Sequence, residues 1–403
     1  MSYLIFCAIE VGGLPYRMAE ILNAHGVETY YASIAKPHQS HDSTQFHYGQ
    51  VSAPWDLTPR FREIRRSGKR VKTLLSQIRR EFNFTHVLAT GQKAYLLREA
   101  GLPYNYWSFG SDLDWQVSLL SSLAYCYPWW AWPRGLLAYL LLYWREARRT
   151  FTNASAVMIA PYQLAAYRRV CPDKPLFFLP HFFKIEDLET LAARKLASRR
   201  ELGAKIGAAR FFFSSTRQVW SGLLRRSSDN KGNDVILRAF REYLDLAGDR
   251  EAKLVLVAKG PDVGASRALA RKLNLNPRVV WAREMPRAQL DQYYQGAGLC
   301  FGQFGTPVLT FAALEPMAQA NVSISYFEPV DPQVPWYAAA PPAFRSRDPR
   351  EIGEFMARIA AAPREYADLC QRSWAWVKEN CSEARFAAEF VKSFSLESDR
   401  PSG

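Results

Sequence analysis

The chain has 403 residues, which is more than one ordinary hydrophobic core accommodates, so two domains are expected. Its composition, 48% hydrophobic and 22% charged, excludes an intrinsically disordered chain. The formal net charge of +14 predicts a surface that attracts phosphate groups, whether these belong to nucleotides, nucleic acid or anionic lipids.

The first half of the chain alternates short apolar runs with helical patterns. We expect a strand at Tyr3–Ala8, a turn at Gly12 and Gly13, and a helix at Tyr16–His25 that ends before Gly26. Strand, glycine turn and helix in this order are typical of the start of a doubly wound parallel sheet. Further strands are expected at Glu28–Ser33, His86–Ala89, Asn105–Ser108, Ala154–Ala160 and Leu176–Leu179.

The second half repeats this alternation. Strands are expected at Arg210–Ser215, Lys253–Ala258, Arg278–Trp281, Leu299–Gln303 and Val322–Tyr326. Helices are expected at Asp234–Ala247, Ser266–Leu273, Arg287–Ala297 and Leu314–Gln319. The predicted fold is therefore α/β, with two doubly wound Rossmann-like domains facing a central cleft, because ligands of open α/β sheets bind at the carboxyl ends of the strands.

The domain boundaries follow from the same patterns. We expect a first Rossmann-like domain over residues 1–185, a linker over the charged, helical stretch 186–209, and a second Rossmann-like domain over 210–363. Residues 364–403 open with a helical pattern over Arg364–Phe394, just after Pro363. This last segment either crosses back onto the first domain or is the ordinary last helix of the second.

Cysteine usage and the first residues bear on the compartment. No C-x-x-C pair occurs among the six cysteines, which are Cys7, Cys126, Cys171, Cys300, Cys370 and Cys381. Cys7 and Cys300 lie in strand-like runs, so we expect buried thiols of a reducing compartment rather than a disulfide framework. The opening MSYLIFCAIEVGG has no basic region and no small-residue cleavage site, so we expect a first strand and a cytoplasmic protein.

Two cations follow a strand in the second half. Arg217 comes just after the strand at Arg210–Ser215, and Lys231 with Gly232 precedes the helix at Asp234–Ala247. Fixed cations and helix N-terminal amides are suited to gripping a diphosphate, whose leaving charge they stabilise without a metal. The alternative is that both are solvated surface charges, but their spacing ahead of the downstream motif favours binding.

Two glycine loops and one carboxylate follow the next strands. Gly260 lies in a turn after a strand, and a plain strand-end turn is its alternative. Gly305, Thr306 and Val308 belong to a loop ahead of Glu315, which lies near the start of a helical pattern. A carboxylate there can accept hydrogen bonds from both hydroxyls of a ribose. The alternative is a first-turn glutamate that offsets the helix dipole.

Together these motifs resemble the nucleotide-sugar half of family 4 glycosyltransferases, which are retaining enzymes with the GT-B fold. The clearest similarity is Lys231-Gly232, followed by Asp234 and a helix containing Ala239-Phe240. It covers most of the chain from residue 210 to residue 327, with weaker matches in the first half.

The resemblance implies a role for each motif. Arg217 and Lys231 would hold the diphosphate, and Glu315 would hold the ribose. Gly12 and Gly13 would lie near the donor phosphates. The remaining donor-binding positions would be Gly260, Gly305, Thr306 and Val308. In this family the leaving phosphate is thought to help deprotonate the acceptor, so no dedicated base is expected.

Two of the departures from the family pattern bear on the transferred sugar and the reacting centre. Pro307 stands where the family has the first of two glutamates, which contacts the transferred sugar. Phe109 stands where a strand of the first half usually ends in a histidine, ahead of Gly110-Ser111-Asp112. Asp112 is then the expected polar group near the reacting centre, with a helix N-cap or turn aspartate as the alternative.

Two patterns that suggest metals are set aside. Asp112-Leu113-Asp114 spells D-x-D, a metal–diphosphate motif of the other large glycosyltransferase fold, but three residues match by chance often and the surrounding pattern is that of GT-B. His38, His41 and His47 lie in a polar loop without the geometry of a metal site. We expect no metal and no cofactor beyond the donor substrate.

Two stretches suggest contact with a membrane surface. Trp115–Trp144 is aromatic and apolar but is interrupted by Pro128, Pro133 and Arg134, which favours an interfacial hairpin or a hydrophobic acceptor groove over a membrane-spanning helix. The other is a basic amphipathic pattern, for which a solvated basic face over a buried helix is the alternative. Its basic residues are Arg60, Arg62, Arg65, Arg66, Lys69, Arg70, Lys72, Arg79 and Arg80.

The sequence therefore predicts a retaining, hexosyltransferase-like, metal-independent glycosyltransferase. It would move a sugar from a nucleotide-sugar donor to a hydroxyl of a lipid-linked or cell-envelope glycan, in the cytoplasm or at the inner face of the membrane. One alternative is a catalytically degenerate GT-B scaffold that only binds a nucleotide, glycan or partner protein. Another is nucleic-acid binding through the basic surface, which lacks any recognised motif and is not expected.

Overall fold

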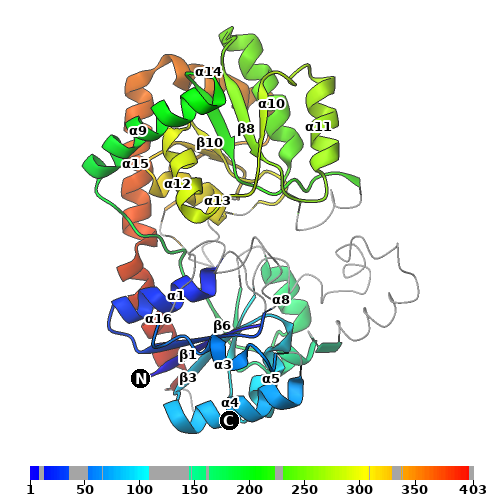
Figure 1. Cartoon of the computed structure of the whole chain (residues 1–403), viewed down its shortest axis with the longest axis vertical. Helices are drawn as coiled ribbons and strands as arrows, with labels where there is room; N and C mark the ends of the chain where they lie inside the picture. Colours follow the sequence, from blue (N-terminus) through cyan, green and yellow to red (C-terminus); the bar gives the residue numbers. More distant parts are fainter. Residues whose placement is uncertain are drawn as a thin grey trace. The chain divides into compact units, whose positions relative to one another are not determined.

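A computed structural model describes residues 1–8, 13–35, 53–65, 67–108, 145–146, 148–159, 163–222, 230–307, 309–328, 337 and 339–398. The chain forms two compact units (Figure 1). Unit 1 comprises Met1–Leu179 and Phe386–Gly403, and unit 2 comprises Pro180–Arg385.

Unit 1 is built on a six-stranded parallel sheet with the order β2-β1-β3-β4-β5-β6. Its strands are β1 (Tyr3–Cys7), β2 (Thr29–Ser33), β3 (His86–Thr90), β4 (Asn105–Trp107), β5 (Val157–Met158) and β6 (Leu176–Phe177). Its helices are α1 (Leu14–Ala24), α3 (Thr58–Phe61), α4 (Gly68–Phe82), the 3-10 turn η1 (Gln92–Ala94), α5 (Tyr95–Glu99), α8 (Leu164–Val170) and most of α16 (Glu383–Ser398).

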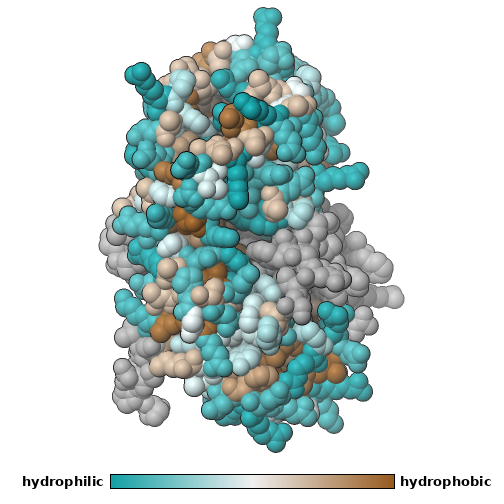
Figure 2. Space-filling view, turned by 60° about the vertical axis from the view of Figure 1, so that its left-hand side comes forward, coloured by the Kyte–Doolittle hydropathy of each residue, from teal (hydrophilic) through white to brown (hydrophobic). Residues whose placement is uncertain are grey.

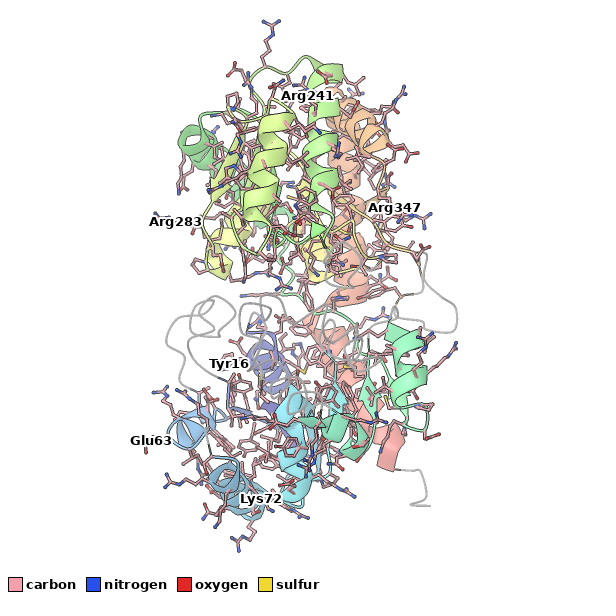
Figure 3. The ribbon with its side chains drawn as sticks, turned by 90° about the vertical axis from the view of Figure 1, so that its right-hand side faces the viewer. Tyr16, Glu63, Lys72, Arg241, Arg283 and Arg347 are labelled. Atoms are coloured by element: carbon pink, nitrogen blue, oxygen red, sulfur yellow. The ribbon has the colours of Figure 1, made fainter. Side chains whose placement is uncertain are left out.

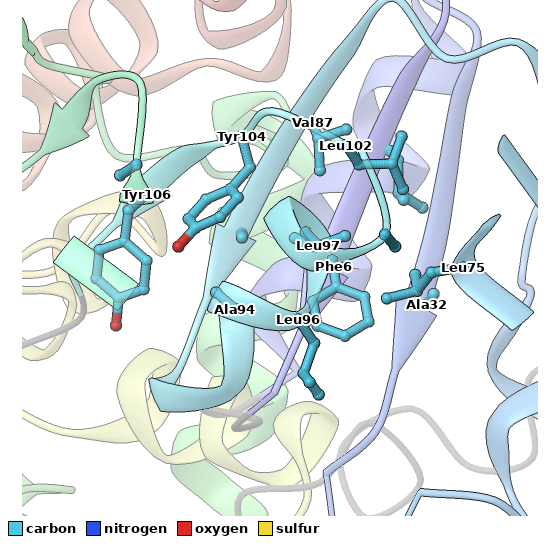
Figure 4. Packing of buried hydrophobic residues seen from close by; sticks show 14 of the residues in the cluster. Phe6, Ala32, Leu75, Val87, Ala94, Leu96, Leu97, Leu102, Tyr104 and Tyr106 are labelled. Carbon is cyan, nitrogen blue, oxygen red and sulfur yellow. The ribbon is translucent and has the colours of Figure 1, made fainter. Parts of the chain in front are cut away.

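Both faces of the unit 1 sheet are covered, which is why its strands are apolar runs rather than alternating ones. Phe6 of β1 belongs to a core cluster with Leu75 of α4 and Leu97 of α5 (Figure 4). On the other face Tyr3 packs against Phe390 and Phe394 of α16, with ring centroids 5.2 and 5.6 Å apart. Phe390 and Phe394 of α16 therefore contribute to the hydrophobic packing of unit 1.

Unit 2 repeats the architecture with the order β12-β11-β10-β7-β8-β9, again with parallel pairing throughout. Its strands are β7 (Phe211–Ser214), β8 (Lys253–Val257), β9 (Val279–Ala282), β10 (Cys300–Phe301), β11 (Ser323–Ser325) and β12 (Phe344–Arg345). Its helices are α9 (Leu188–Ile206), α10 (Asn233–Ala247), α11 (Val263–Lys272), α12 (Arg287–Gly296), α13 (Phe311–Ala318), α14 (Pro349–Ala361) and α15 (Pro363–Cys381).

The strand β7 shows how one apolar run serves two layers. Phe212 lies in the cluster formed with α10, α11 and α14, whereas Phe211 and Phe213 lie in the cluster formed with α9 and α12. Successive side chains of a strand point to opposite faces, so three consecutive phenylalanines fill both sides of the sheet. The predicted α/β class with two doubly wound parallel sheets is confirmed.

Two segments differ in detail from what the sequence predicts. The stretch expected as a linker forms α9, which is capped by Asp187 (Oδ1 accepts from the Thr190 amide at 2.8 Å) and buries Leu191 and Leu202 within unit 2. The single helical pattern expected at Arg364–Phe394 is two helices, α15 and α16, separated at Ser382. The extended backbone of Ser382 pairs with Phe183, which ends the first of them.

The basic amphipathic segment lies in α3 and α4, and Gly68 begins α4 rather than breaking it. Its apolar residues Phe61, Val71 and Leu75 are fully buried in the core of unit 1. The solvated basic face over a core helix, the alternative interpretation, describes this segment. Lys72 illustrates the exposed face, with 47% of its side chain accessible (Figure 3).

The described surface seen in Figure 2 is mostly hydrophilic, with hydrophobic residues in small scattered groups. In the described part of the chain, no helix is both long enough and apolar enough to cross a bilayer. The described cysteines, Cys7, Cys171, Cys300, Cys370 and Cys381, are all buried thiols. Trp115–Trp144 and the histidines His38, His41 and His47 lie outside the described residues.

A buried histidine near the start of unit 2 makes stability depend on pH. The Tyr337 hydroxyl accepts the His181 amide at 3.2 Å and lies 2.5 Å from His181 Nδ1. The His181 side chain is buried, which disfavours the charged form of its ring. Burial accordingly lowers the pKa of His181 to about 3.

We expect the free energy of unfolding to fall as the pH decreases from about 6.5, where an unfolded histidine titrates. Between that value and the native pKa the unfolded state binds one more proton, so the slope reaches at most about 1.4 kcal/mol per pH unit. Chemical denaturation at several pH values compares the wild type with His181→Asn. Equal slopes for the two proteins below pH about 6 would contradict this assignment.

Candidate functional site

The strand order of unit 2 reverses between β7 and β10. From β7 the chain proceeds through β8 to β9 on one side, and from β10 through β11 to β12 on the other. In open α/β sheets ligands bind outside the carboxyl ends of the strands at such a reversal. The segments concerned are residues 215–222 after β7, 258–262 after β8, 302–310 after β10, and 230–232 before α10.

Backbone hydrogen bonds join these segments to one another. The Gln218 amide donates to the Lys259 carbonyl at 2.6 Å, and the Lys231 amide donates to the Val219 carbonyl at 2.6 Å. The Phe304 amide then donates to the Lys231 carbonyl at 2.9 Å. Lys231 is thus held between the segment after β7 and the segment after β10.

Two predicted glycines lie where these segments approach most closely. A Cβ on Gly305 would fall 2.5 Å from the Asn230 carbonyl oxygen. Gly260 has a φ of +106°, and a Cβ there would fall 2.6 Å from the Gln218 carbonyl oxygen. Side chains at either position would push the segments apart.

The two predicted cations lie on adjoining segments. Arg217 is exposed three residues after the end of β7, and Lys231 is half-buried immediately before the N-cap of α10, which is Gly232. Asn233, the first residue of α10, is buried; its Oδ1 accepts from the Val219 amide at 3.0 Å and its Nδ2 donates to Thr216 Oγ1 at 3.0 Å. Asn233 therefore joins the segment that carries Arg217 (residues 215–222) to the N-terminus of α10, whose amides favour anions.

Asp262, which no sequence motif identifies, holds the same segment from the other side. Its Oδ2 accepts from the amides of Trp220 (2.6 Å) and Ser221 (2.8 Å), and its Oδ1 accepts from the Ser221 hydroxyl at 2.7 Å. The carboxylate is buried, and its three hydrogen bonds come from the half-buried Trp220 and Ser221.

Glu315 lies on α13 with both carboxylate oxygens engaged from α12. Oε1 forms an ion pair with Arg287, and Oε2 accepts from the Tyr294 hydroxyl at 2.5 Å. Arg287 also pairs with Asp291 at 3.0 Å. Glu315 is the fifth residue of α13, so a role in offsetting the helix dipole from the first turn does not describe it.

Burial shapes the protonation of this group. Tyr294 is fully buried, and burial raises its pKa well above the usual value, so the hydroxyl keeps the proton that it donates to Glu315. Burial also raises the pKa of Asp291. No sequence motif identifies Arg287 or Tyr294, although their seven-residue spacing places them on one face of the helix expected at Arg287–Ala297.

The remaining predicted site residues lie in the loop after β10, at the start of α1, or outside the described residues. Thr306 is half-buried, and its hydroxyl donates to the Asn230 carbonyl at 3.0 Å. Pro307 is exposed beside it. In unit 1, Gly13 caps α1 in the left-handed conformation (φ 70°), beyond the carboxyl end of β1. The predicted Gly12, Asp112 and Val308 lie outside the described residues, as do Phe109 and Asp114.

The described residues also bear on other kinds of ligand site. Among the residues that the structure describes, no group of three or more His, Cys, Asp or Glu side chains is arranged to hold a metal ion. A pocket with a volume of about 410 Å³ lies beyond β11 and β12 and is lined by Tyr326, Arg345 and Arg347, among others. Arg347 stacks over the Tyr326 ring at 4.8 Å and projects from unit 2 (Figure 3).

Solved structures of known proteins share this architecture over almost the whole chain. Anabaena Alr3699/HepE in complex with UDP and glucose aligns with a TM-score of 0.63 at 12% identity, covering 98% of this chain and 99% of that one. Sucrose-phosphate synthase from Thermosynechococcus elongatus aligns with a TM-score of 0.60 at 14% identity, covering 98% and 99%. WaaG, a glycosyltransferase involved in lipopolysaccharide biosynthesis, aligns with a TM-score of 0.55 at 14% identity, covering 98% and 99%.

At these identities the similarity establishes the fold. The chain has the GT-B fold, with two six-stranded parallel sheets and surrounding helices. No family model matches the sequence, and no curated protein sequence matches it either.

Removing the Asp262 carboxylate tests whether it holds the segment after β7. We expect Asp262→Ala to lower the free energy of unfolding by about 1–3 kcal/mol, because three part-buried donors lose their charged acceptor. Asp245→Ala is the matched control, since Asp245 is exposed and forms an ion pair with Arg241 of the same helix. Arg241 is labelled in Figure 3. Urea denaturation measures both. A loss for Asp262→Ala no larger than that for Asp245→Ala would contradict the bracing role.

Proposed function

We propose that the chain is a glycosyltransferase that moves a sugar from a nucleotide-sugar donor to an acceptor hydroxyl. The observation that carries the proposal is the convergence of Arg217, Lys231 and the amino end of α10 on one edge of the unit 2 sheet, with Glu315 on a neighbouring helix. Among the similar structures, Alr3699/HepE is described in complex with UDP-glucose, which supports a nucleotide-sugar as the donor class.

The cations would act on the leaving group. When the bond between the sugar C1 and the diphosphate oxygen breaks, the electron pair stays on that oxygen, and negative charge grows on the diphosphate. Hydrogen bonds hold the backbone segments that carry Arg217 and Lys231, and the α10 amides, before the reaction starts, so little reorganisation would be needed to stabilise this charge. The acceptor oxygen forms the new bond to C1, and its proton passes to the departing phosphate. Bond formation on the same face of the sugar retains the configuration.

The loop after β10 would contact the sugar differently from a loop bearing a carboxylate. Pro307 has neither charge nor donor, and the Thr306 proton is already donated to the Asn230 carbonyl. Thr306 can therefore only accept from a sugar hydroxyl. The acceptor that we propose is a lipid-linked or cell-envelope glycan, in keeping with the basic surface and with the aromatic content of the chain.

Nucleotide binding tests the donor site. We expect one of UDP, GDP, ADP or CMP to raise the melting temperature of the wild type. The shift should be lost in Glu315→Ala and reduced in Arg217→Ala, because each change removes one of the contacts assigned to the nucleotide. Arg241→Ala, at a half-buried arginine of α10 that pairs with Asp245, is the control and should keep the shift. Absence of a shift with every nucleotide would contradict the donor site.

A second candidate is a scaffold that binds the nucleotide without transferring the sugar. It is favoured by Pro307, which stands in place of a sugar-binding carboxylate. Release of free nucleoside diphosphate from a panel of nucleotide-sugars separates the two candidates. The transferase predicts slow donor hydrolysis even without an acceptor, and Lys231→Met should abolish it. Nucleotide binding without any turnover, with or without candidate glycan acceptors, would favour the scaffold.

We also propose that the exposed basic face of α4 attaches unit 1 to an anionic membrane surface. The apolar side of α4 is buried in the core of unit 1 and does not reach a membrane. The attraction between α4 and the lipid headgroups would therefore be electrostatic and weakened by salt. We expect sedimentation with phosphatidylglycerol vesicles at low salt and release at about 0.5 M salt. Replacing Lys69, Arg70 and Arg80 by serine should reduce binding more than replacing Arg241, Arg350 and Arg372. Equal reduction would contradict a specific face.

A further inference from the structure

The carboxylate of Glu315 is the centre of a chain of side chains that runs across unit 2. The chain, called here the carboxylate brace, is made of Asp291, Arg287, Glu315, Tyr294 and Ser215. It connects α12 to α13 and reaches the first residue after β7, two residues before Arg217. No position of the brace other than Glu315 is identified by the sequence motifs.

The directions of the hydrogen bonds follow from the groups involved. A carboxylate can only accept, so the single proton of the Tyr294 hydroxyl goes to Glu315 Oε2. The Ser215 hydroxyl, 2.7 Å from the Tyr294 oxygen, therefore donates to it. Arg287 donates an N–H to Glu315 Oε1 and forms an ion pair with Asp291 at 3.0 Å. Each oxygen of Glu315 thus has one protein partner.

One partner on each oxygen leaves accepting capacity on both. A carboxylate offers about four lone-pair positions, two on each oxygen. With one used on either side, the remaining capacity suits two hydroxyls on adjacent carbons, one for each oxygen. The side chain of Glu315 is 14% exposed, so it is largely enclosed yet still reachable.

We infer that Arg287 and Tyr294 are positioning residues that aim Glu315 at the two hydroxyls of a ribose, and that the brace, rather than the carboxylate alone, sets selectivity for ribose over 2′-deoxyribose. The inference rests on the proposed nucleotide site. A glutamate without such partners rotates about its side-chain bonds, and ordering it on binding costs free energy. The partners in the brace already order the Glu315 side chain when the protein folds, so this free energy is not lost again when the nucleotide binds.

The chain offers a matched control at the opposite end of the same sheet. Arg210, just before β7, donates to Asp249 Oδ2 at 2.9 Å and to the Tyr243 hydroxyl at 3.0 Å, and Tyr243 donates to Asp249 at 2.7 Å. Tyr243, like Tyr294, is fully buried. Tyr243→Phe and Tyr294→Phe therefore remove the same kind of hydroxyl from the same unit, but only the second lies in the brace.

The experiment measures the ratio of two affinities. Isothermal titration calorimetry gives the dissociation constants of UDP, GDP and ADP and of their 2′-deoxy counterparts for the wild type, Tyr294→Phe, Arg287→Met, Glu315→Gln, Tyr243→Phe and Arg210→Met. We expect the wild type to prefer the ribonucleotide by about tenfold, the worth of one hydrogen bond to a charged group. The preference should fall to about twofold or less in Tyr294→Phe and Arg287→Met, as in Glu315→Gln, and stay at the wild-type value in the two controls.

The outcomes separate the inference from the function that it rests on. If the wild type binds none of these nucleotides, the proposed donor site and the inference both fail. If the wild type prefers the ribonucleotide and Glu315→Gln does not, but Tyr294→Phe and Arg287→Met keep the full preference, the donor site stands and the positioning role fails. A loss of stability without a change in the ratio likewise overturns the positioning role, because a purely structural residue weakens both ligands equally.

Discussion

The structure depends on one constraint, which is that the segments leaving the carboxyl ends of β7, β8 and β10 occupy the same small space. Gln218, Lys231 and Phe304 share hydrogen bonds across three of these segments. Gly260 and Gly305 permit distances that no side chain would tolerate. Because each segment supplies partners for another, the site is formed by the fold of unit 2 and does not need a ligand to assemble the protein groups described here.

The constraint also explains how charge is handled near the site. The carboxylates of Asp262 and Glu315 are satisfied by amides, a hydroxyl or an arginine, as enclosed charges must be. Arg217, by contrast, is exposed on the segment that these groups hold in place. Enclosed acceptors fix the scaffold, and cations at its edge remain accessible to an anionic ligand. A net charge of +14 adds long-range attraction for such ligands.

Much of the fold could be predicted from the sequence because parallel strands buried on both faces are continuous apolar runs. Tyr3–Ala8 and Lys253–Ala258 were placed within a residue of β1 and β8. Contacts between distant segments left no local signal, so Arg287, Tyr294 and Asp262 were missed, although each touches a segment that carried a prediction. Helix ends differ more from the prediction. The helix α13 begins at Phe311 rather than Leu314. Ser382 divides a helical pattern because its backbone pairs with Phe183.

A crystal structure of the chain with bound UDP, or with whichever nucleoside diphosphate binds most tightly, would test the central claim most directly. We predict the diphosphate at the N-terminus of α10, within hydrogen-bonding distance (about 3 Å) of Arg217 or Lys231, and the ribose hydroxyls on Glu315. A nucleotide bound away from the carboxyl ends of β7 and β10, or with its ribose out of reach of Glu315, would contradict the account.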